Sequence, residues 1–382
     1  MRTLIRDVRI FDGERTTKRA DVCMEDDTIV RPGVGPVDVT VDGTGKTLLP
    51  GLIDSHTHIF DGSLAQALDH GVTTELDMFC LPSNLDKQRR LADERDDVAD
   101  FRSAGMLATA PGGHPSQLLA GLADSGGFGD AATGFEPIGD AGRAEEFVAA
   151  RLAEGACYLK VVVDDGGVHG MELPVLSVDV LRALVSAAHR AGLPVIAHAI
   201  TAPEVETALE VGVDGLAHVW CDSVKRAEEL AARVAEQGVF VVSTLVYFEV
   251  ISRPSAGGVD HAGPDSGATA VRVARALHEA GVPLLAGTDA TPFAPGHGHG
   301  LHRELRLLTG AGLSNVEALM AATSLPADRF GLTDRGRVAP GKRADLLLVD
   351  GDPTEDVAAV ESIAGVWRRG VRLERAATGD KG

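Results

Sequence analysis

Short apolar runs, each preceded by an amphipathic stretch that ends in glycine, recur through the middle of the chain. Gly192 precedes the apolar run 194–198, for example, and Gly281 precedes the run 283–288. A glycine after a helix adopts the left-handed conformation at no steric cost, and continuous apolar strands are typical of sheets buried on both faces. About eight such strand–helix repeats predict an α/β fold of the (β/α)₈ TIM-like barrel type.

The helical stretches also carry recognisable starts. Ser177 precedes an apolar pattern with helical spacing, and Ser314 with Glu317 forms a capping box. An open doubly wound sheet is the alternative interpretation of the same alternation. It is less favoured because no Gly-rich phosphate loop follows the first strand.

The two ends of the chain have a different pattern. Residues 1–49 alternate short strands with turns, and about fifty such residues cannot build an independent core. The apolar stretches 344–349 and 365–371 also have the pattern of strands, so both ends can complete one unit. We therefore predict a small β-sandwich domain formed by both termini (1–49 and 335–382), with the barrel (50–334) inserted between them.

Side chains that can bind metal stand at the ends of several predicted strands. His56 and His58 are two residues apart, so they project from the same face of a strand. The carboxyl ends of parallel strands meet at one mouth of a barrel. A single buried histidine is as readily a hydrogen-bonded core residue as a ligand, but the joint occurrence favours a metal site. The predicted metal ligands are His56, His58, Lys160, His198, His218 and Asp289.

Lys160 lies inside an apolar strand, where an ammonium group is costly unless it is paired or neutralised. A desolvated lysine loses its proton readily, and the free amine can add carbon dioxide to form a carbamate. A carbamate has two oxygens and can bridge two cations. One metal would then be held by His56, His58 and Asp289 and the other by His198 and His218, with carbamylated Lys160 and a hydroxide between them.

The amino-acid composition argues against some classes of binding partner. The chain has 382 residues, of which 44% are hydrophobic but only 4% aromatic, so the core must be aliphatic. A net charge of −20 argues against nucleic acid or an anionic membrane surface as a partner. The four cysteines lack the spacing of a metal site. The charged residues near the N-terminus argue against a secretory signal peptide, and no apolar run is long enough to span a membrane. We expect a cytoplasmic homo-oligomer that acts on a small molecule.

Three segments carry a resemblance to a known family. They are Pro-Gly-Leu-Ile-Asp-Ser-His-Thr-His at 50–58, Gly-Thr-Asp at 287–289, and the segment 336–348 that leads back into the β-sandwich. Together with the ligand set they resemble the amidohydrolase superfamily of metal-dependent hydrolases. A lysine on the fourth strand is typical of its binuclear branch. The resemblance implies two divalent metal ions, with zinc expected, a carbamylated Lys160, and hydrolysis of amide or other C–N bonds.

Within that superfamily, His299-Gly300 followed by Glu304-Leu305 resembles the imidazolonepropionase-like and Xaa-Pro dipeptidase-like group. Dipeptidase-like members carry an aromatic and a basic residue just after the histidine of the fifth strand, suited to a substrate carboxylate. Residues 199–204, which follow His198 here, contain neither. This difference indicates a substrate that is neutral, bulky or apolar.

Long Gly/Pro-rich segments interrupt the repeats at 111–142, 250–266 and 290–300. In a barrel such segments lie after strands, where substrate loops are found. We favour this role for the first and third, which contain histidines. Asp164 and Asp165 are interpreted as turn-forming residues. The candidate substrate-binding residues are His114, Tyr247 and His299.

The predicted reaction is hydrolysis of an amide bond by metal-bound hydroxide, with Asp289 as both metal ligand and proton shuttle. A small molecule such as an N-acyl amino acid or a dipeptide-like compound would be the substrate. The same barrel and metals could instead hydrolyse lactones or phosphotriesters, or form a mononuclear deaminase in which Lys160 is unmodified. A non-catalytic scaffold is the remaining alternative, and the complete ligand set argues against it.

Overall fold

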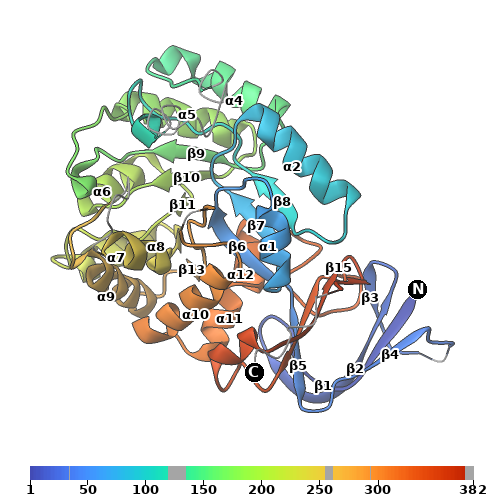
Figure 1. Ribbon diagram of the computed structural model, residues 1–382. Coiled ribbons are helices and arrows are strands. Elements are labelled where there is room, and N and C mark those ends of the chain that lie inside the picture. The colour runs from blue at the N-terminus through green and yellow to red at the C-terminus, as the bar shows by residue number, and fades with distance from the viewer. Residues whose placement is uncertain (34, 119–134, 254–260, 293, 375–382) are drawn as a thin grey trace.

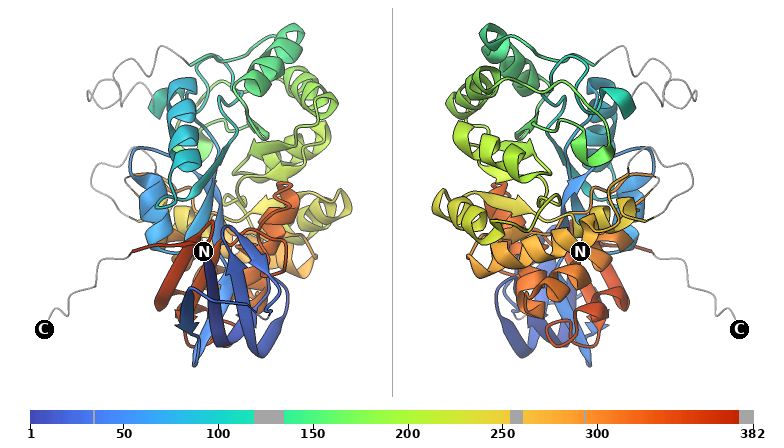
Figure 2. Two further views of the ribbon diagram at one scale, coloured as in Figure 1. Left: turned by 90° about the vertical axis from the view of Figure 1, so that its right-hand side faces the viewer. Right: turned by 90° about the vertical axis from the view of Figure 1, so that its left-hand side faces the viewer.

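The computed structural model describes the chain except for residues 34, 119–134, 254–260, 293 and 375–382. Each of the three Gly/Pro-rich segments contains some of these residues, so the loop roles predicted there lie partly outside the described residues. In the described part, an α/β region and a β-sheet occupy opposite ends of the molecule (Figures 1 and 2).

Parallel strands form the inner layer of the α/β region and are grouped into two sheets in the described part of the chain. The strand orders are β13-β12-β11-β10-β9 and β6-β7-β8. Isolated parallel bridges pair Thr57 of β6 with Ala290, beyond the end of β13, and Val161 of β9 with Ala108, beyond the end of β8. The α/β prediction is confirmed, whereas full closure of a barrel stays a prediction. The strands are β6 (Leu52–Thr57), β7 (Val72–Asp77), β8 (Asp100–Ser103), β9 (Leu159–Val162), β10 (Val195–His198), β11 (Gly215–Leu216), β12 (Phe240–Val242) and β13 (Leu284–Leu285).

Helices cover the outside of these strands (Figure 1). The Ser177 side chain accepts the Val180 N–H at the start of α5, and Ser314 forms a complete capping box with Glu317 at the start of α11, so both predicted helix starts are confirmed. No helix within the described ranges has the length and apolarity that a membrane span needs. The helices are α1 (Ser63–Asp69), α2 (Pro82–Glu94), η2 (Ala141–Arg143), α4 (Ala144–Ala153), η3 (Gly167–His169), α5 (Val178–Arg190), α6 (Ala202–Val211), α7 (Ala227–Glu236), α8 (Leu245–Ile251), α9 (Ser266–Glu279), α10 (His299–Ala311), α11 (Asn315–Ala321), α12 (Ser324–Arg329) and η4 (Val357–Glu361).

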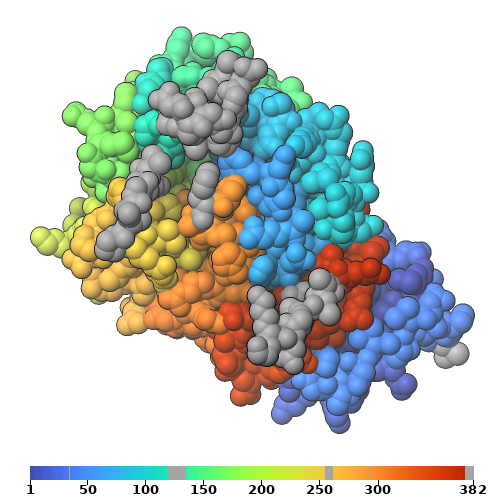
Figure 3. All heavy atoms as spheres, in the orientation of Figure 1, coloured from blue at the N-terminus to red at the C-terminus, as the bar shows by residue number. Residues whose placement is uncertain are grey.

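Strands from both ends of the chain pair in a separate sheet, which we call the terminal sheet. Its order is β16-β15-β14-β5-β1-β2-β3, and β4 pairs with β1. Because β14 runs antiparallel to β5, the C-terminal strands lie beside the N-terminal ones (Figure 3). A sandwich of two sheets and the domain boundaries stay predictions. The strands are β1 (Arg2–Phe11), β2 (Thr16–Glu25), β3 (Thr28–Val30), β4 (Val39–Asp42), β5 (Lys46–Pro50), β14 (Leu346–Asp350), β15 (Ile363–Arg368) and β16 (Val371–Arg372).

Two features of the strands differ from the sequence prediction. The strand predicted over 365–371 is confirmed as far as Arg368 in β15 but is not continuous, because β15 and β16 form a hairpin that turns at Arg369 and Gly370. Both turn residues have positive φ (49° and 75°), as a two-residue hairpin turn requires. In addition, β8 was not predicted, because the sequence Asp-Phe-Arg-Ser contains no apolar run.

The buried side chains along β9 determine where its lysine points. Leu159 and Val161 belong to the large aliphatic cluster that includes the apolar faces of the surrounding helices. Alternate residues of a strand face opposite sides, so Lys160 points away from those helices, toward the inside of the strand layer. The alternation along β9 therefore places the Lys160 amine on the inner side of the strands, where the other predicted metal ligands are expected.

Candidate metal centre

The imidazoles of His56 and His58 both face the carboxylate of Asp289. The distances from Asp289 Oδ1 are 3.2 Å to His56 Nε2 and 3.0 Å to His58 Nε2. His56 Nδ1 lies 3.0 Å from the carbonyl oxygen of Ala217. A carbonyl only accepts, so Nδ1 carries the proton and the Nε2 lone pair is directed toward the Asp289 side. This is the tautomer in which His56 Nε2 can bind a metal.

Backbone contacts between β6 and the end of β13 fix the position of Asp289. Its N–H donates to the His56 carbonyl at 2.8 Å, and its φ of 58° lies in the left-handed region, which aspartate tolerates better than most residues. A Cβ at Gly287 would lie 2.4 Å from Val242 Cγ1 and 2.9 Å from the His56 nitrogen. Glycine at 287 therefore lets the two strand ends approach closely enough for Asp289 to reach both histidines.

The buried carboxylate of Asp54 holds the same two strand ends together. It accepts the His56 N–H at 3.2 Å, the Thr288 N–H at 3.1 Å and the Thr288 hydroxyl at 2.7 Å. All three donors belong to a predicted ligand, His56, or to the neighbour of one, Thr288, so Asp54 fixes the backbone from which His56 and Asp289 project. Asp54 lies within the 50–58 motif, but no role for it was predicted from the sequence.

A second pair of histidines lies beside the first. His198, the last residue of β10, has its Nδ1 3.0 Å from the Nε2 of His218, which follows β11. The other nitrogen of His218, Nδ1, lies 2.8 Å from the Thr244 hydroxyl oxygen. When Nδ1 donates to Thr244, His218 presents a lone pair to His198. Facing imidazole nitrogens at this distance suit a shared cation.

Lys160 is 2% exposed, and its Nζ has no hydrogen-bond partner within the described residues. Burial lowers the pKa of the Lys160 amine to about 7, although the charges of Asp289 and Asp77 act in the opposite direction. An orphaned buried amine is costly for a protein unless another group joins it. The position is therefore compatible with the carbamate that the sequence predicts.

The protonation states of the cluster suit metal binding. Burial, followed by the charge of Lys160, lowers the pKa of His56 to about 3, and burial also holds the pKa of His218 well below its ordinary value. For Asp289, burial alone would raise the pKa, but His56 and His58 outweigh it and hold the pKa well below its ordinary value. Neutral imidazoles and an ionised carboxylate are the forms that bind metals.

The donor set tests whether a metal would fit. One donor atom each from His56, His218 and Asp289 lies within 4.8 Å of the other two. Histidine and carboxylate donors in a buried site suit zinc or a similar divalent ion. With the orphaned amine of Lys160 on the same side of the strands, these residues fit the implied metal centre, whereas the division of ligands between two ions stays a prediction.

The three candidate substrate-binding residues lie in different surroundings. His114 stacks on His198, with ring centroids 4.8 Å apart, and the Tyr247 ring lies 5.6 Å from that of His218. The ring contact of His299 is instead with His70, at 5.7 Å, and not with any of the six predicted ligands. The structure thus brings His114 and Tyr247 to the cluster. A role in substrate binding stays a prediction for all three residues.

Asp164 has contacts that the sequence analysis missed. As expected of a turn-forming residue, its Oδ1 accepts the Gly166 N–H at 2.8 Å. However, Asp164 is only 1% exposed, and its Oδ2 lies 3.5 Å from both His198 Nε2 and His114 Nδ1. Its position directly after the Lys160 strand was the available signal. Asp165, in contrast, is exposed, and its side chain accepts only the Gly167 N–H among the described hydrogen bonds.

A buried ion pair supports the centre from the side of β7. His297 Nδ1 lies 3.0 Å from Glu75 Oε2, and both side chains are fully buried. Burial alone would lower the pKa of His297, but the Glu75 carboxylate outweighs it and raises the pKa. This pair fixes the segment between Asp289 and α10 against β7. The histidines of this segment are visible in the sequence, but no local pattern distinguishes His297 among them.

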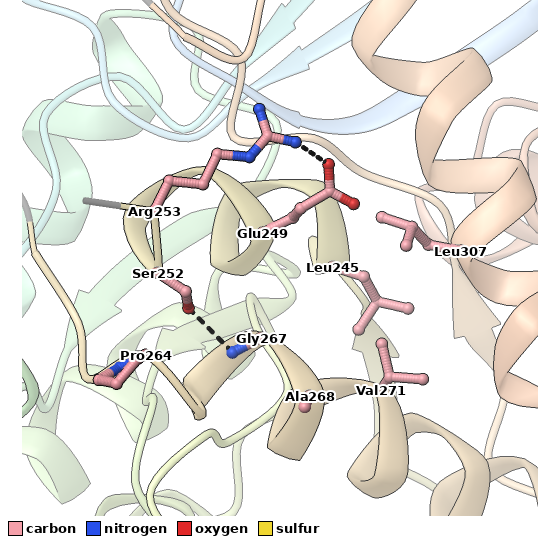
Figure 4. A pocket seen from close by; sticks show the side chains of 9 residues that line it. All are labelled: Leu245, Glu249, Ser252, Arg253, Pro264, Gly267, Ala268, Val271 and Leu307. Atoms are coloured by element: carbon pink, nitrogen blue, oxygen red, sulfur yellow. Dashed lines mark hydrogen bonds and ion pairs between the residues drawn. The ribbon is translucent and has the colours of Figure 1, made fainter. Parts of the chain in front are cut away.

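A surface cleft lies away from this cluster, between α8, α9 and α10 (Figure 4). Its volume is about 370 Å³. Arg253 pairs with Glu249, four residues earlier at the end of α8, and the Ser252 hydroxyl accepts the Gly267 N–H at 2.9 Å. None of the predicted metal ligands lines the cleft, so we do not assign it to the centre. The lining residues are Leu245, Glu249, Ser252, Arg253, Pro264, Gly267, Ala268, Val271 and Leu307.

The chain is similar to several known proteins. The family model described as the amidohydrolase family matches residues 47–373. An uncharacterized protein of Mycobacterium tuberculosis is 28% identical over 343 residues, covering 84% of this chain and 83% of that protein. The imidazolonepropionase of Deinococcus radiodurans is 30% identical over 213 residues, which cover 53% of this chain and 47% of that enzyme.

Among solved structures, the chain is similar to a Xaa-Pro dipeptidase with methionine bound in its active site. The TM-score is 0.79, the sequence identity is 21%, and the match covers 98% of this chain and 100% of the other. At this identity the likeness shows the fold. The α/β region and the terminal sheet together match the fold of that structure.

Proposed function

This chain belongs to the amidohydrolase family, and from this premise we propose that it is a metal-dependent hydrolase of amide (C–N) bonds. The observation that supports the proposal most directly is the cluster of His56, His218 and Asp289, whose donor atoms lie within 4.8 Å of one another. The buried, orphaned amine of Lys160 completes the argument, because an unmodified lysine has no evident structural reason to be there.

In the proposed centre, His56, His58 and Asp289 would hold one divalent ion, and His198 and His218 would hold the other. Lys160, as a carbamate, would contribute an anionic oxygen to each. Bound divalent ions would supply an activated water and polarise the carbonyl of the substrate.

Asp289 has the position of the acid–base group. Its Oδ1 lies 3.2 Å from His56 Nε2 and 3.0 Å from His58 Nε2, within the proposed centre, and as an ionised carboxylate it can accept a proton. We assign it the transfer of a proton from the attacking water to the leaving nitrogen. Asp54 and Thr288 keep its backbone fixed during this transfer.

Few positively charged side chains lie in the segments that follow the strands of the α/β region. This lack indicates which charge the substrate carries. Neither lysine nor arginine occurs in 103–142, 161–181, 191–224 or 276–302. Directly after His198, Ala199 and Ile200 are fully buried. A substrate carboxylate in this mouth would lack a cationic partner, so we propose that the enzyme prefers uncharged amides over N-acyl amino acids and dipeptides.

The test is an activity screen of the zinc-loaded protein, produced with bicarbonate, against matched substrate pairs. Each pair consists of an N-acyl amino acid and the amide of the same acyl group with an uncharged alkylamine. The scissile bond is then of the same kind in both, and only the first carries a carboxylate. We expect kcat/KM to be at least about tenfold higher for the neutral member, a difference of about 1.4 kcal/mol. Faster cleavage of the charged member would contradict the substrate preference, and no amide hydrolysis by the loaded protein would contradict the function.

Two further measurements separate the alternatives. Lactones and phosphotriesters belong in the same screen, and hydrolysis of these alone would favour a different hydrolase on the same fold. Metal content per chain distinguishes the proposed centre from a mononuclear deaminase. About two ions per chain are expected for the former and about one for the latter.

A further inference from the structure

We propose that Asp164 is a positioning residue, which orients the His198 imidazole so that His198 Nδ1 faces the metal centre. This inference rests on the proposed function, since it concerns one of the proposed ligands. It differs from the role expected from the sequence, in which Asp164 only forms a turn.

The backbone places Asp164 opposite His198. β9 and β10 are parallel, with Val162 paired to His198, and the Val163 N–H donates to the His198 carbonyl at 2.9 Å. Asp164 follows directly, so its side chain starts from a position that the strand pairing fixes relative to His198. The Oδ1–Gly166 hydrogen bond at 2.8 Å then sets the rotation of the carboxylate.

The contacts of the second oxygen set this carboxylate apart from an ordinary turn. Asp164 Oδ2 lies 3.5 Å from His198 Nε2 and 3.5 Å from His114 Nδ1. Neither Asp164 Oδ2 nor His198 Nε2 has a closer hydrogen-bond partner in the described part of the chain, and both atoms are buried. A turn needs only one oxygen of the aspartate, whereas here the other is buried against two imidazoles.

The consequence concerns the tautomer of His198. A carboxylate beside Nε2 favours the proton on that nitrogen, which leaves the lone pair on Nδ1. Nδ1 is the atom that lies 3.0 Å from His218 Nε2, where the second metal is proposed. Carboxylates that hold a ligating histidine from behind fix the ring and increase its basicity. Asp164 would therefore strengthen binding of one metal without touching it.

The experiment titrates the zinc-depleted protein with Zn²⁺ by calorimetry in the presence of bicarbonate, for wild type and Asp164→Asn. Asparagine keeps an oxygen for the Gly166 N–H but removes the charge near His198. We expect one of the two binding events to weaken by about 10- to 100-fold, while the other event is unchanged. The thermal unfolding temperature of the zinc-depleted protein should stay the same, because asparagine keeps the turn, so the loss of affinity would come from the charge beside His198 and not from a damaged turn.

Asp165→Asn is the matched control, because this neighbouring side chain is exposed and bonds only to the Gly167 N–H among the described hydrogen bonds. It should bind both metals as wild type does. Asp164→Ser, which keeps a hydroxyl oxygen for the turn, is the second variant and should show the same selective loss. Wild-type affinity for both metals in the Asp164 variants, or an equal loss in Asp165→Asn, would overturn the inference. Failure of the wild type to bind two metals would overturn the proposed centre itself.

Discussion

At the scale of the single residue, Asp289 has both a specific set of side-chain contacts and an unusual backbone conformation. It faces His56 Nε2 and His58 Nε2 at 3.2 and 3.0 Å, and the hydrogen bond from its N–H to the His56 carbonyl stabilises its left-handed φ of 58°. An aspartate that only capped the following helix would need neither contact. The geometry is that of a group held in place for a specific chemical role.

The first prediction is that Asp289→Asn lowers kcat by about 10²- to 10⁴-fold on the best amide of the screen, because asparagine cannot carry the transferred proton. Steady-state kinetics and metal analysis of the same preparation check it. Asp61→Asn is a suitable control, since Asp61 is exposed and pairs with Lys87. Near-normal turnover with full metal content would exclude Asp289 as the proton carrier.

The second prediction concerns Lys160, whose amine is buried without a hydrogen-bond partner in the described residues. Lys160→Ala should lose metal and activity, and added propionate should restore part of both by placing a carboxylate where the carbamate would be. Native mass spectrometry of the wild type should show the added mass of one carbon dioxide. Full activity of Lys160→Ala without propionate would contradict a bridging role, and Lys87→Ala, at an exposed position, provides the control.

At the scale of the element, β8 is a strand without an apolar run, and ion pairs hold its first residue in place. Its first residue, Asp100, is buried and pairs with Arg335, with Arg343 at 3.2 Å and with Arg368 at 3.4 Å. These arginines come from the C-terminal part of the chain, far away in sequence. The ion cluster therefore joins the α/β region to the segment that leads into the terminal sheet.

The third prediction is that Asp100→Asn lowers the free energy of unfolding by roughly 3–5 kcal/mol near pH 7, because it leaves buried guanidinium charges less compensated. Chemical denaturation of both proteins measures the difference. Asp97→Asn, at an exposed pair with Arg95, should cost no more than about 1 kcal/mol.

The same cluster has a predictable pH dependence. Burial alone would raise the pKa of Asp100, but Arg335 and Arg343 outweigh it and hold the pKa well below its ordinary value. A depressed pKa means that the stabilisation is complete above the unfolded value of about 4 and is lost as the pH falls below it. The stability difference between wild type and Asp100→Asn should therefore shrink below about pH 4, and a constant difference would contradict this assignment.

At the scale of the whole molecule, the terminal sheet joins the two ends of the chain. Ile5, Leu48, Leu346 and Trp367 pack in one buried cluster, so strands from both ends share a core. About fifty residues at either end could not bury enough surface alone. The α/β region is thus held between two segments that stabilise each other.

The fourth prediction is that Trp367→Ala destabilises the protein by about 3–5 kcal/mol, because it leaves a cavity in the core shared by both ends. Urea denaturation of the full chain checks it. Val371→Ala, at a residue that is 45% exposed, should change the stability by less than about 0.5 kcal/mol. A loss below about 1 kcal/mol for Trp367→Ala would show that the terminal sheet does not depend on this shared core.

The sequence alone determined which elements alternate and which side chains stand at the strand ends. Periodicity, glycine after helices and capping residues act locally, so Ser177, Ser314 and the α/β alternation could be predicted. Lys160 could be predicted as a functional residue because a charged amine between buried aliphatic residues is energetically costly unless it is paired or neutralised. The family followed from the motif at 50–58 and the Gly-Thr-Asp at 287–289.

Only the tertiary structure decided which of these residues meet. Asp164 lies against His198 because β9 and β10 pair in one particular register, and His297 lies against Glu75 because the segment before α10 folds onto β7. His299, two residues from His297, instead contacts His70. Such contacts depend on strand order and register over long separations, and no local periodicity encodes them.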